Sequence, residues 1–406
     1  MSTTAESTAA PRATAQPSFF DRVANLLPGW GWALLFAAIG IAYGALGQEW
    51  FGEELYDAMI TTLAFVIMAL GLNIVVGFAG LLDLGYVAFY AIGAFVAGWL
   101  MSAHFAGVIG GEDGIHIGVS EVTRNLPGLH INFIIVLIAA AAFTALWGAV
   151  LGFPTLRLRG DYLAIVTLAF GEIVPRVFEL SQSGPFGIGS VDLSNGRQGI
   201  TPIDKPYLPV PGLENVTRIE IKPYYFIALA MLAITLFVNF RLRDSRLGRA
   251  WIAVREDEVA AAAMGVDLVR VKLWAYAIGA ALGGFAGVFL GFYRNTVNVD
   301  QFEFGFSVFV LCMVIIGGMG NIAGVVLGAV VLSLFDKYVL PELNGVPDAV
   351  GLDFDVTAVA FGVFGFFLLV MMTLRPEGFL PNRRRRMELH EGDMLHEEPV
   401  YEVRKG

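Results

Sequence analysis

The sequence predicts an all-α membrane protein that crosses the bilayer about eight to ten times. Of its 406 residues, 56% are hydrophobic and only 15% are charged, whereas soluble domains carry about 25% charged residues. The apolar residues form long continuous runs, and a run of about 20 such residues crosses a bilayer as a helix. The alternating pattern of a membrane β-barrel strand is absent. The expected fold class is therefore a polytopic helical membrane protein.

Apolar runs follow one another along the chain, separated by charged or glycine-rich connections. They cover roughly 30–46, 58–78, 84–104, 131–153, 161–180, 224–240, 271–293, 304–319, 321–340 and 355–374. We expect a disordered tail at 1–29, a transmembrane domain at 30–380 and a charged tail at 381–406. Within the domain, 181–223 and 241–270 are long loops. Cys312, the single cysteine, lies in an apolar run, so no disulfide is predicted.

Arginine is concentrated in three connections, and this distribution predicts which side of the membrane each connection faces. These are Arg157 and Arg159; Arg241, Arg243, Arg246, Arg249 and Arg255; and Arg383–Arg386. Because basic loops stay on the cytoplasmic side, we expect all three regions and both termini there. Ten crossings satisfy this arrangement if the region 304–340 is broken in two. A pair of re-entrant half-helices would lower the number of crossings.

Glycines predict close helix packing and a helix break. Gly279, Gly283 and Gly287 recur every four residues, a spacing that lets helix backbones approach. The break is expected at Gly317, Gly318, Gly320 and Asn321, where Asn321 would satisfy freed backbone groups. The stretch VVGFAG at 75–80 also resembles IIGGMG at 315–320, and glycine-interrupted internal repeats point to a central pathway.

A charged segment, DSRLGRAWIAVREDEVAAAAMGVD at 244–267, interrupts two membrane-length runs. Glu256, Asp257 and Glu258 are predicted to form the first turn of a helix of about ten residues that Gly265 ends. A helix that lies on lipid headgroups would carry large apolar anchors and a basic polar face. This one offers the small side chains of Ala260–Ala263, which favour docking into a protein groove.

Several segments resemble one transporter family. GRAWIAVREDEVAAAAMGVDLVRVKLWAYAIGAALGGFAGVF is similar to the coupling loop and following span of permease subunits from bacterial branched-chain amino-acid ABC importers, the LivM type. The same family is resembled by LRLRGDYLAIVTLAFGEIV at 156–174, GLNIVVGFAGLLDLGYVAFYAIGAF at 71–95, VIIGGMGNIAGVVLGAVV at 314–331 and LRPEGFLP at 374–381. The resemblance runs from about 58 to 381 and weakens in the 181–223 loop and in the tails.

The resemblance implies that the charged segment is a coupling helix moved by separate ATPase subunits. The residues expected to couple are Gly248, Arg249, Ala250, Arg255, Glu256, Asp257, Ala261 and Gly265. The implied partners are a second permease in a heterodimer, two cytoplasmic ATPases that hold ATP and Mg, and a periplasmic binding protein, at the bacterial inner membrane. The chain has no G-x-x-x-x-G-K-[ST] loop, so we expect no enzyme activity and no cofactor. Its scattered histidines and overall charge indicate no metal site and no nucleic-acid partner, while lipid is an expected partner.

Four polar residues inside spans are candidates for the translocation pathway: Asn73, Thr167, Glu172 and Arg176. Glu172 and Arg176 lie four apart on one helical face. Either they line the outer pathway, where a zwitterionic amino acid would meet both charges, or they pair with each other. Asn73 and Thr167 either contact substrate or hydrogen-bond neighbouring helices, the commoner role of such residues.

Three alternatives remain open at this point. Urea importers have related permease subunits, so a urea or small-amide substrate competes with an amino acid. An ion-coupled secondary transporter would need titratable groups near the midplane, and apart from Glu172 the spans offer few. A channel would not explain the charged segment.

Overall fold

The computed structural model describes residues 29–106, 114–120, 123–155, 161–181, 192–207, 220–343, 360–374 and 378–380. Several predictions fall outside these residues. They concern Arg157 and Arg159, Arg383–Arg386, both terminal tails up to residue 28 and from 381, and most of the 181–223 loop.

The protein is a helical membrane protein, which confirms the predicted fold class. Its long helices are α2 (Gly29–Phe51), α3 (Glu53–Leu72), α4 (Val87–Leu100), α5 (Phe133–Thr155), α6 (Asp161–Leu180), α7 (Lys222–Arg243), α10 (Leu268–Arg294), α11 (Phe304–Gly317), α12 (Ile322–Leu334) and α15 (Ala360–Leu374). Each coincides with one predicted apolar run. In the described part of the chain, 5 helical stretches are long and apolar enough to span a membrane: Glu53–Phe78, Phe133–Pro154, Lys222–Arg243, Leu268–Arg294 and Ile322–Glu342.

Two of the spans are not uniform α-helices. α3 continues into a π-helix, η1 (Asn73–Phe78), and α12 continues through a second one, η5 (Phe335–Val339), into α13 (Leu340–Leu343). A π-helical turn widens the backbone ring and is frequent at functional sites. The presence of η1 therefore makes the end of α3 a candidate functional region.

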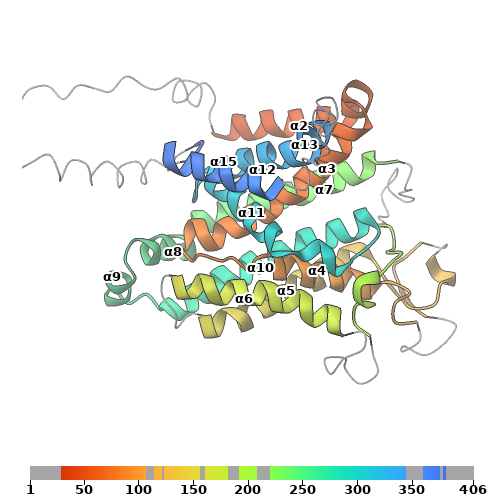
Figure 1. Cartoon of the computed structure of the whole chain (residues 1–406), viewed down its shortest axis with the longest axis horizontal. Coiled ribbons are helices and arrows are strands. Elements are labelled where there is room, and N and C mark those ends of the chain that lie inside the picture. Colours follow the sequence, from red (N-terminus) through yellow and green to blue (C-terminus); the bar gives the residue numbers. More distant parts are fainter. Residues whose placement is uncertain are drawn as a thin grey trace, which may run out of the picture.

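Helix α10 is the centre of the packing and lies against α3, α4 and α5 (Figure 1). Glycines allow the closest approaches. A Cβ on Gly93 of α4 would lie 2.3 Å from the Gly284 Cα, and one on Gly287 would lie 2.4 Å from the Tyr90 carbonyl oxygen. Gly279 faces the Gly71 carbonyl of α3 and Gly283 lies against Tyr86. Because lipid tails are as apolar as the side chains, such backbone contacts supply the van der Waals packing that holds membrane helices together.

The region 304–340 folds as two helices, because the chain turns between Gly317 and Asn321. Gly318 and Gly320 adopt φ values of +108° and +83°, which strongly favour glycine. Asn321 caps α12, since its side chain accepts a hydrogen bond from the Ala323 backbone N–H. α11 and α12 then pack closely, and a Cβ on Gly324 would lie 2.2 Å from the Gly317 carbonyl oxygen.

One end of the bundle, here called the sheet end, is covered by a small sheet. Strands β1 (Met101–Ser102), β3 (Leu129–Ile131) and β2 (Ile115–Ile117) lie in that order. β1 pairs with β3 antiparallel and β2 pairs with β3 in parallel. The short helices η2 (Thr123–Asn125), η3 (Gly196–Gln198) and η4 (Val299–Phe302) lie in the connections. In Figure 1 the sheet end lies opposite α8 and α9, which are described below.

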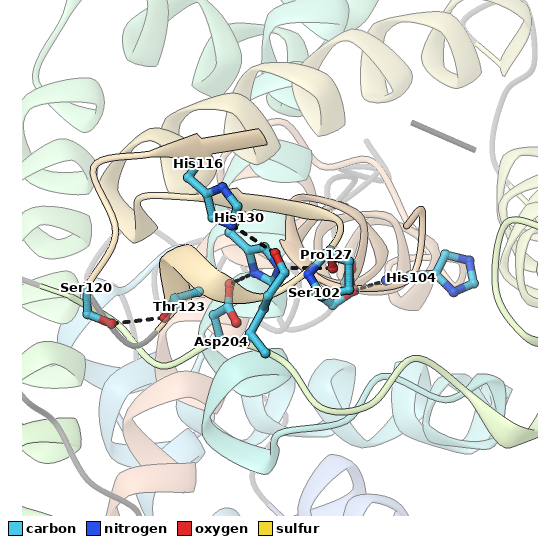
Figure 2. A network of polar contacts seen from close by, with 10 residues as sticks. Ser102, His104, His116, Ser120, Thr123, Pro127, His130 and Asp204 are labelled. Atoms are coloured by element: carbon cyan, nitrogen blue, oxygen red, sulfur yellow. Dashed lines mark hydrogen bonds and ion pairs between the residues drawn. The ribbon is translucent and has the colours of Figure 1, made fainter. Parts of the chain in front are cut away.

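A polar network joins the sheet to the connection between α6 and α7 (Figure 2). His130 is buried, and its Nδ1 lies 2.6 Å from Oδ2 of Asp204, whose own backbone N–H donates to the Met101 carbonyl. His116 stacks on His130 with ring centroids 5.2 Å apart. Burial raises the pKa of the Asp204 carboxyl, and the hydrogen bond with His130 opposes part of that effect. The sequence does not reveal the stacked pair of His116 and His130, because these residues become neighbours only through strand pairing.

Candidate functional site

The charged segment at 244–267 forms two helices, so the single helix predicted from its acidic run is wrong. α8 (Arg246–Glu256) begins at Ser245, whose hydroxyl caps the Gly248 N–H. Asp257 is extended, with φ −154° and ψ 110°, and its carboxylate accepts from the N–H groups of Val259 and Ala260. α9 is therefore only Glu258–Ala263, and Glu256 closes α8 instead of opening α9. The helix end predicted at Gly265 agrees with the structure, since Gly265 has φ +86° just after α9.

α8 is fixed rigidly to the ends of its neighbours. Trp251 is fully buried, and its indole Nε1 donates to the Val271 carbonyl of α10 at 2.7 Å. A Cβ on Gly248 would lie 2.2 Å from the Leu242 carbonyl oxygen of α7, so α8 needs glycine at that position. Because α8 is bound to both α7 and α10, a force applied to it would reach both spans.

α9 projects away from the rest of the bundle (Figure 1), and its exposed face is apolar. We call this face the α9 tip: Val259, Ala260, Ala263 and Met264, all exposed. Val259 is 70% exposed and Met264 is 85% exposed. Ala261, by contrast, is only 5% exposed and packs against the rest of the chain, and its coupling role stays a prediction. An exposed cluster of apolar side chains on an otherwise polar loop is typical of a protein contact.

An ion pair holds α9 in place. Lys272 of α10 is 5% exposed, and its ammonium lies 2.6 Å from the Glu258 carboxylate. Neither Lys272 nor the two large side chains of the α9 tip were predicted from the sequence. Val259 and Met264 are the largest apolar residues that flank the alanine run, and this position was the sequence signal that could have identified them.

The other predicted coupling residues are spread over α8. Arg249 is exposed and donates to the Asp244 carbonyl at 2.9 Å. Ala250 is half-buried, and Glu256 and Asp257 are exposed. Only Arg255 reaches into the bundle, where its Nη1 donates to the Gly77 carbonyl at 2.6 Å.

The two glycine stretches that resemble each other in sequence lie side by side. The Gly320 N–H donates to Oδ1 of Asn73 at 2.9 Å, and a Cβ on Gly77 would lie 2.6 Å from the Gly320 nitrogen. Asn73 is fully buried. The candidate pathway residue Asn73 thus joins the π-helix η1 to the turn between α11 and α12.

Replacing Asn73 with alanine is expected to lower stability. The buried Gly320 N–H would lose its acceptor, which costs about 1–3 kcal/mol. The Asn73 Nδ2 makes no hydrogen bond within the described residues, so its removal offsets part of the loss. We expect a net destabilisation of about 1 kcal/mol, measured as a lower thermal midpoint in detergent. Thr373→Ala, at an exposed hydroxyl bonded only within its own helix, is the control; equal midpoints for the two variants would contradict the prediction.

Thr167 has a structural role in the described fold. It is buried, accepts from the Leu84 N–H at 3.0 Å and donates to the Ala164 carbonyl at 3.0 Å. The residue lines a small pocket between α4, α5, α6 and α10. The other lining residues are Asp83, Gly85, Phe89, Leu151, Phe170 and Tyr276.

The predicted pair between Glu172 and Arg176 does not form. Arg176 instead lies 2.5 Å from Glu179, three residues along α6, and Arg197 bonds the same carboxylate at 2.8 Å. Arg176 is 66% exposed and Glu172 is also exposed. Arg197 lies in η3, in the loop that follows α6, and its side chain reaches Glu179 only in the folded chain, so the sequence did not reveal this competition. As for metals, the residues described contain no cluster of three or more His, Cys, Asp or Glu side chains suited to an ion.

Comparison with known proteins identifies what this architecture is similar to. The family described as "Branched-chain amino acid transport system / permease component" matches residues 55–373. The high-affinity branched-chain amino acid transport system permease protein LivM of Salmonella typhimurium is 35% identical over 362 residues, which cover 84% of this chain and 73% of that protein. LivM of Escherichia coli is 36% identical over 356 residues, covering 83% and 72%. The permease protein LivH of Escherichia coli is 24% identical, covering 80% and 94%. No solved structure matches the chain.

Proposed function

We propose, from the premise that this chain belongs to the family of branched-chain amino acid transport system permease components, that it is the membrane-spanning subunit of an ATP-driven importer of branched-chain amino acids. The observation that carries the proposal is the family match over 55–373, at 35–36% identity to permeases named for that substrate. In this proposal the chain is not itself an enzyme, and ATP and Mg bind to separate ATPase subunits.

The α9 tip is the proposed docking site for an ATPase subunit. Basic loops favour the cytoplasmic side, and the helices α7 and α8 carry five arginines between 241 and 255. The tip would therefore face the cytoplasm, together with both termini. Since α8 is tied to α7 by Gly248 and to α10 by Trp251, closure of the ATPases would move both spans and open the pathway alternately to each side.

Two further protein partners complete the proposal. The similarity to LivH as well as to LivM supports pairing with a related second permease in the bacterial inner membrane. A periplasmic binding protein would deliver substrate at the sheet end, and lipid would surround the spans. Asn73 and Thr167 hold helices together in this arrangement. Glu172 and Arg176, exposed on α6, are the charged groups that a zwitterionic substrate would meet.

Uptake measurements test the proposal directly. Cells that express the chain with its ATPases and binding protein are expected to take up labelled leucine, isoleucine and valine, and to stop when the ATPases carry a mutation that abolishes hydrolysis. Labelled urea is the control substrate, because urea importers have related permeases. Uptake that survives the ATPase mutation would overturn ATP coupling, and uptake of urea alone would overturn the substrate class.

A further inference from the structure

Arg255 is the last arginine of α8 and the residue that joins the charged segment to the interior of the bundle. Its Nη1 donates to the Gly77 carbonyl of η1 at 2.6 Å. The stem of the same side chain covers Gly80, where a Cβ would lie 2.7 Å from the Arg255 Cγ. Gly80 also has φ +70°, so its backbone conformation and its neighbour both favour glycine. One side chain thus holds the whole stretch from Gly77 to Gly80.

The carbonyl that Arg255 binds belongs to the end of a long membrane helix. The continuous helix Glu53–Phe78 has 26 residues, and the last carbonyls of any helix have no partner within it. In a membrane such groups must be satisfied by the protein. A guanidinium at this position supplies a charged donor and also complements the negative end of the helix dipole. The charge of Arg255 therefore has a specific use at this helix end.

Arg255 also lies against the turn between α11 and α12. A Cβ on Gly320 would lie 3.0 Å from the Arg255 Nη1 and 3.1 Å from the Gly77 carbonyl oxygen. The Gly320 N–H is held by Asn73, one turn before Gly77. The guanidinium, the end of η1 and the Gly318–Gly320 turn therefore meet at one point. The end of one membrane helix, at Gly77, and the turn between two others, at Gly320, lie 243 residues apart in the sequence and converge on a residue of α8.

We propose that Arg255 is a positioning residue that clamps the end of η1 and the α11–α12 turn to α8, so that movement of α8 and α9 is passed to η1 and to the α11–α12 turn together. This inference rests on the proposed function, because it assigns the route by which an ATPase docked at the α9 tip acts on the spans. In the proposed function, the α8–α9 unit moves α7 and α10 through the contacts of Trp251 and Gly248. Arg255 adds α3 and α11–α12, which have no other charged link to this unit among the contacts described above.

Removing the guanidinium is expected to uncouple ATP hydrolysis from transport. In proteoliposomes that contain the full complex, we expect Arg255→Ala to lower the ratio of leucine imported to ATP hydrolysed by about tenfold, the scale of one lost charge-assisted hydrogen bond. Arg255→Lys should recover part of the ratio, because an ammonium can still donate to the Gly77 carbonyl but lacks the planar guanidinium that lies beside Gly320. Arg270→Ala is the matched control, since that guanidinium is 82% exposed and pairs with Asp267. Its ratio should equal that of the wild type.

A merely structural role would give a different result. If Arg255 only stabilises the fold, the alanine variant would lose assembled complex, and the ATPase and uptake rates of what remains would fall in proportion, leaving their ratio unchanged. That outcome would overturn the clamp. A wild-type complex that hydrolyses ATP and imports no branched-chain amino acid would instead overturn the proposed function.

Hydrogen exchange tests the clamp without any transport assay. In the permease alone, Arg255→Ala is expected to raise amide exchange both at Leu81, whose N–H bonds to the Val75 carbonyl, and at Gly320, whose acceptor Asn73 is untouched by the substitution. Faster exchange at Leu81 with wild-type protection of Gly320 would mean that Arg255 caps η1 only, and the clamp would be wrong.

Discussion

Met264→Glu is expected to abolish ATP-driven uptake while leaving the permease folded. Met264 is 85% exposed at the α9 tip, and substitutions at such positions change stability by only about 0.5 kcal/mol. In the proposed complex, however, the side chain is buried in a groove of the ATPase. Placing a carboxylate in an apolar contact costs several kcal/mol, and about 3 kcal/mol already corresponds to roughly a hundredfold weaker association.

Three measurements and two further variants make this result specific. Uptake of labelled leucine and copurification of the ATPase should both fall by about a hundredfold, while the thermal midpoint of the purified permease stays unchanged. Val269→Glu, at a 47% exposed apolar residue in the first turn of α10, should leave both quantities intact. Ala261→Glu should instead lower the thermal midpoint, because Ala261 is the buried residue of α9. Normal uptake and copurification in Met264→Glu would contradict docking at the α9 tip.

Gly93→Ala is expected to destabilise the bundle at its centre. The added Cβ would lie 2.3 Å from the Gly284 Cα and 2.4 Å from the Gly284 carbonyl oxygen. These are backbone atoms, so α4 and α10 must separate. Overpacking of this kind costs about 1–3 kcal/mol and occasionally more. We expect a lower thermal midpoint in detergent and less permease in the membrane.

Gly365→Ala is the matched control for this prediction. It lies in α15, and no heavy atom lies within 4 Å of the Cβ it would gain. Alanine is the better helix former by about 1 kcal/mol, so this variant should be as stable as the wild type or slightly more stable. If both glycine variants behaved alike, the close approach of α4 and α10 would not be what requires Gly93.

The spans could be predicted from the sequence because their signal is local. An apolar run long enough to cross a bilayer has few other structures open to it, and each predicted run coincides with a helix such as α5 or α10. The sequence signal for the break between α11 and α12 was also local, since the two glycines that adopt positive φ lie within four residues of each other. Asp257 could have been assigned as an N-cap, because Asp is a stronger cap than Glu, which would have divided α8 from α9.

The contacts of the candidate site could not be predicted because they depend on distant residues. Arg176 pairs with Glu179 instead of Glu172, and the Glu179 carboxylate is also bound by Arg197 from the loop after α6, whose path the sequence does not give. Arg255 meets a carbonyl 178 residues earlier in the chain. Ala261 was predicted as a contact residue because a run of identical alanines does not show which one faces inward. The Lys272–Glu258 ion pair and the packing on α10 set that orientation.

The sheet end gives the molecule a mechanical asymmetry. Strands from the α4–α5 connection are hydrogen-bonded to one another, Asp204 is bonded to Met101, and Ile200 pairs with Val297 just beyond α10. The ends of α4, α5 and α10 are thereby fastened into one block. At the opposite end, the segments that contain α3 and α11 end at glycine-containing turns, and these turns are held by the contacts of single side chains. A displacement applied at α9 would therefore swing the helices about the fastened end, which acts as the pivot, and would be largest where α3 and α11 end.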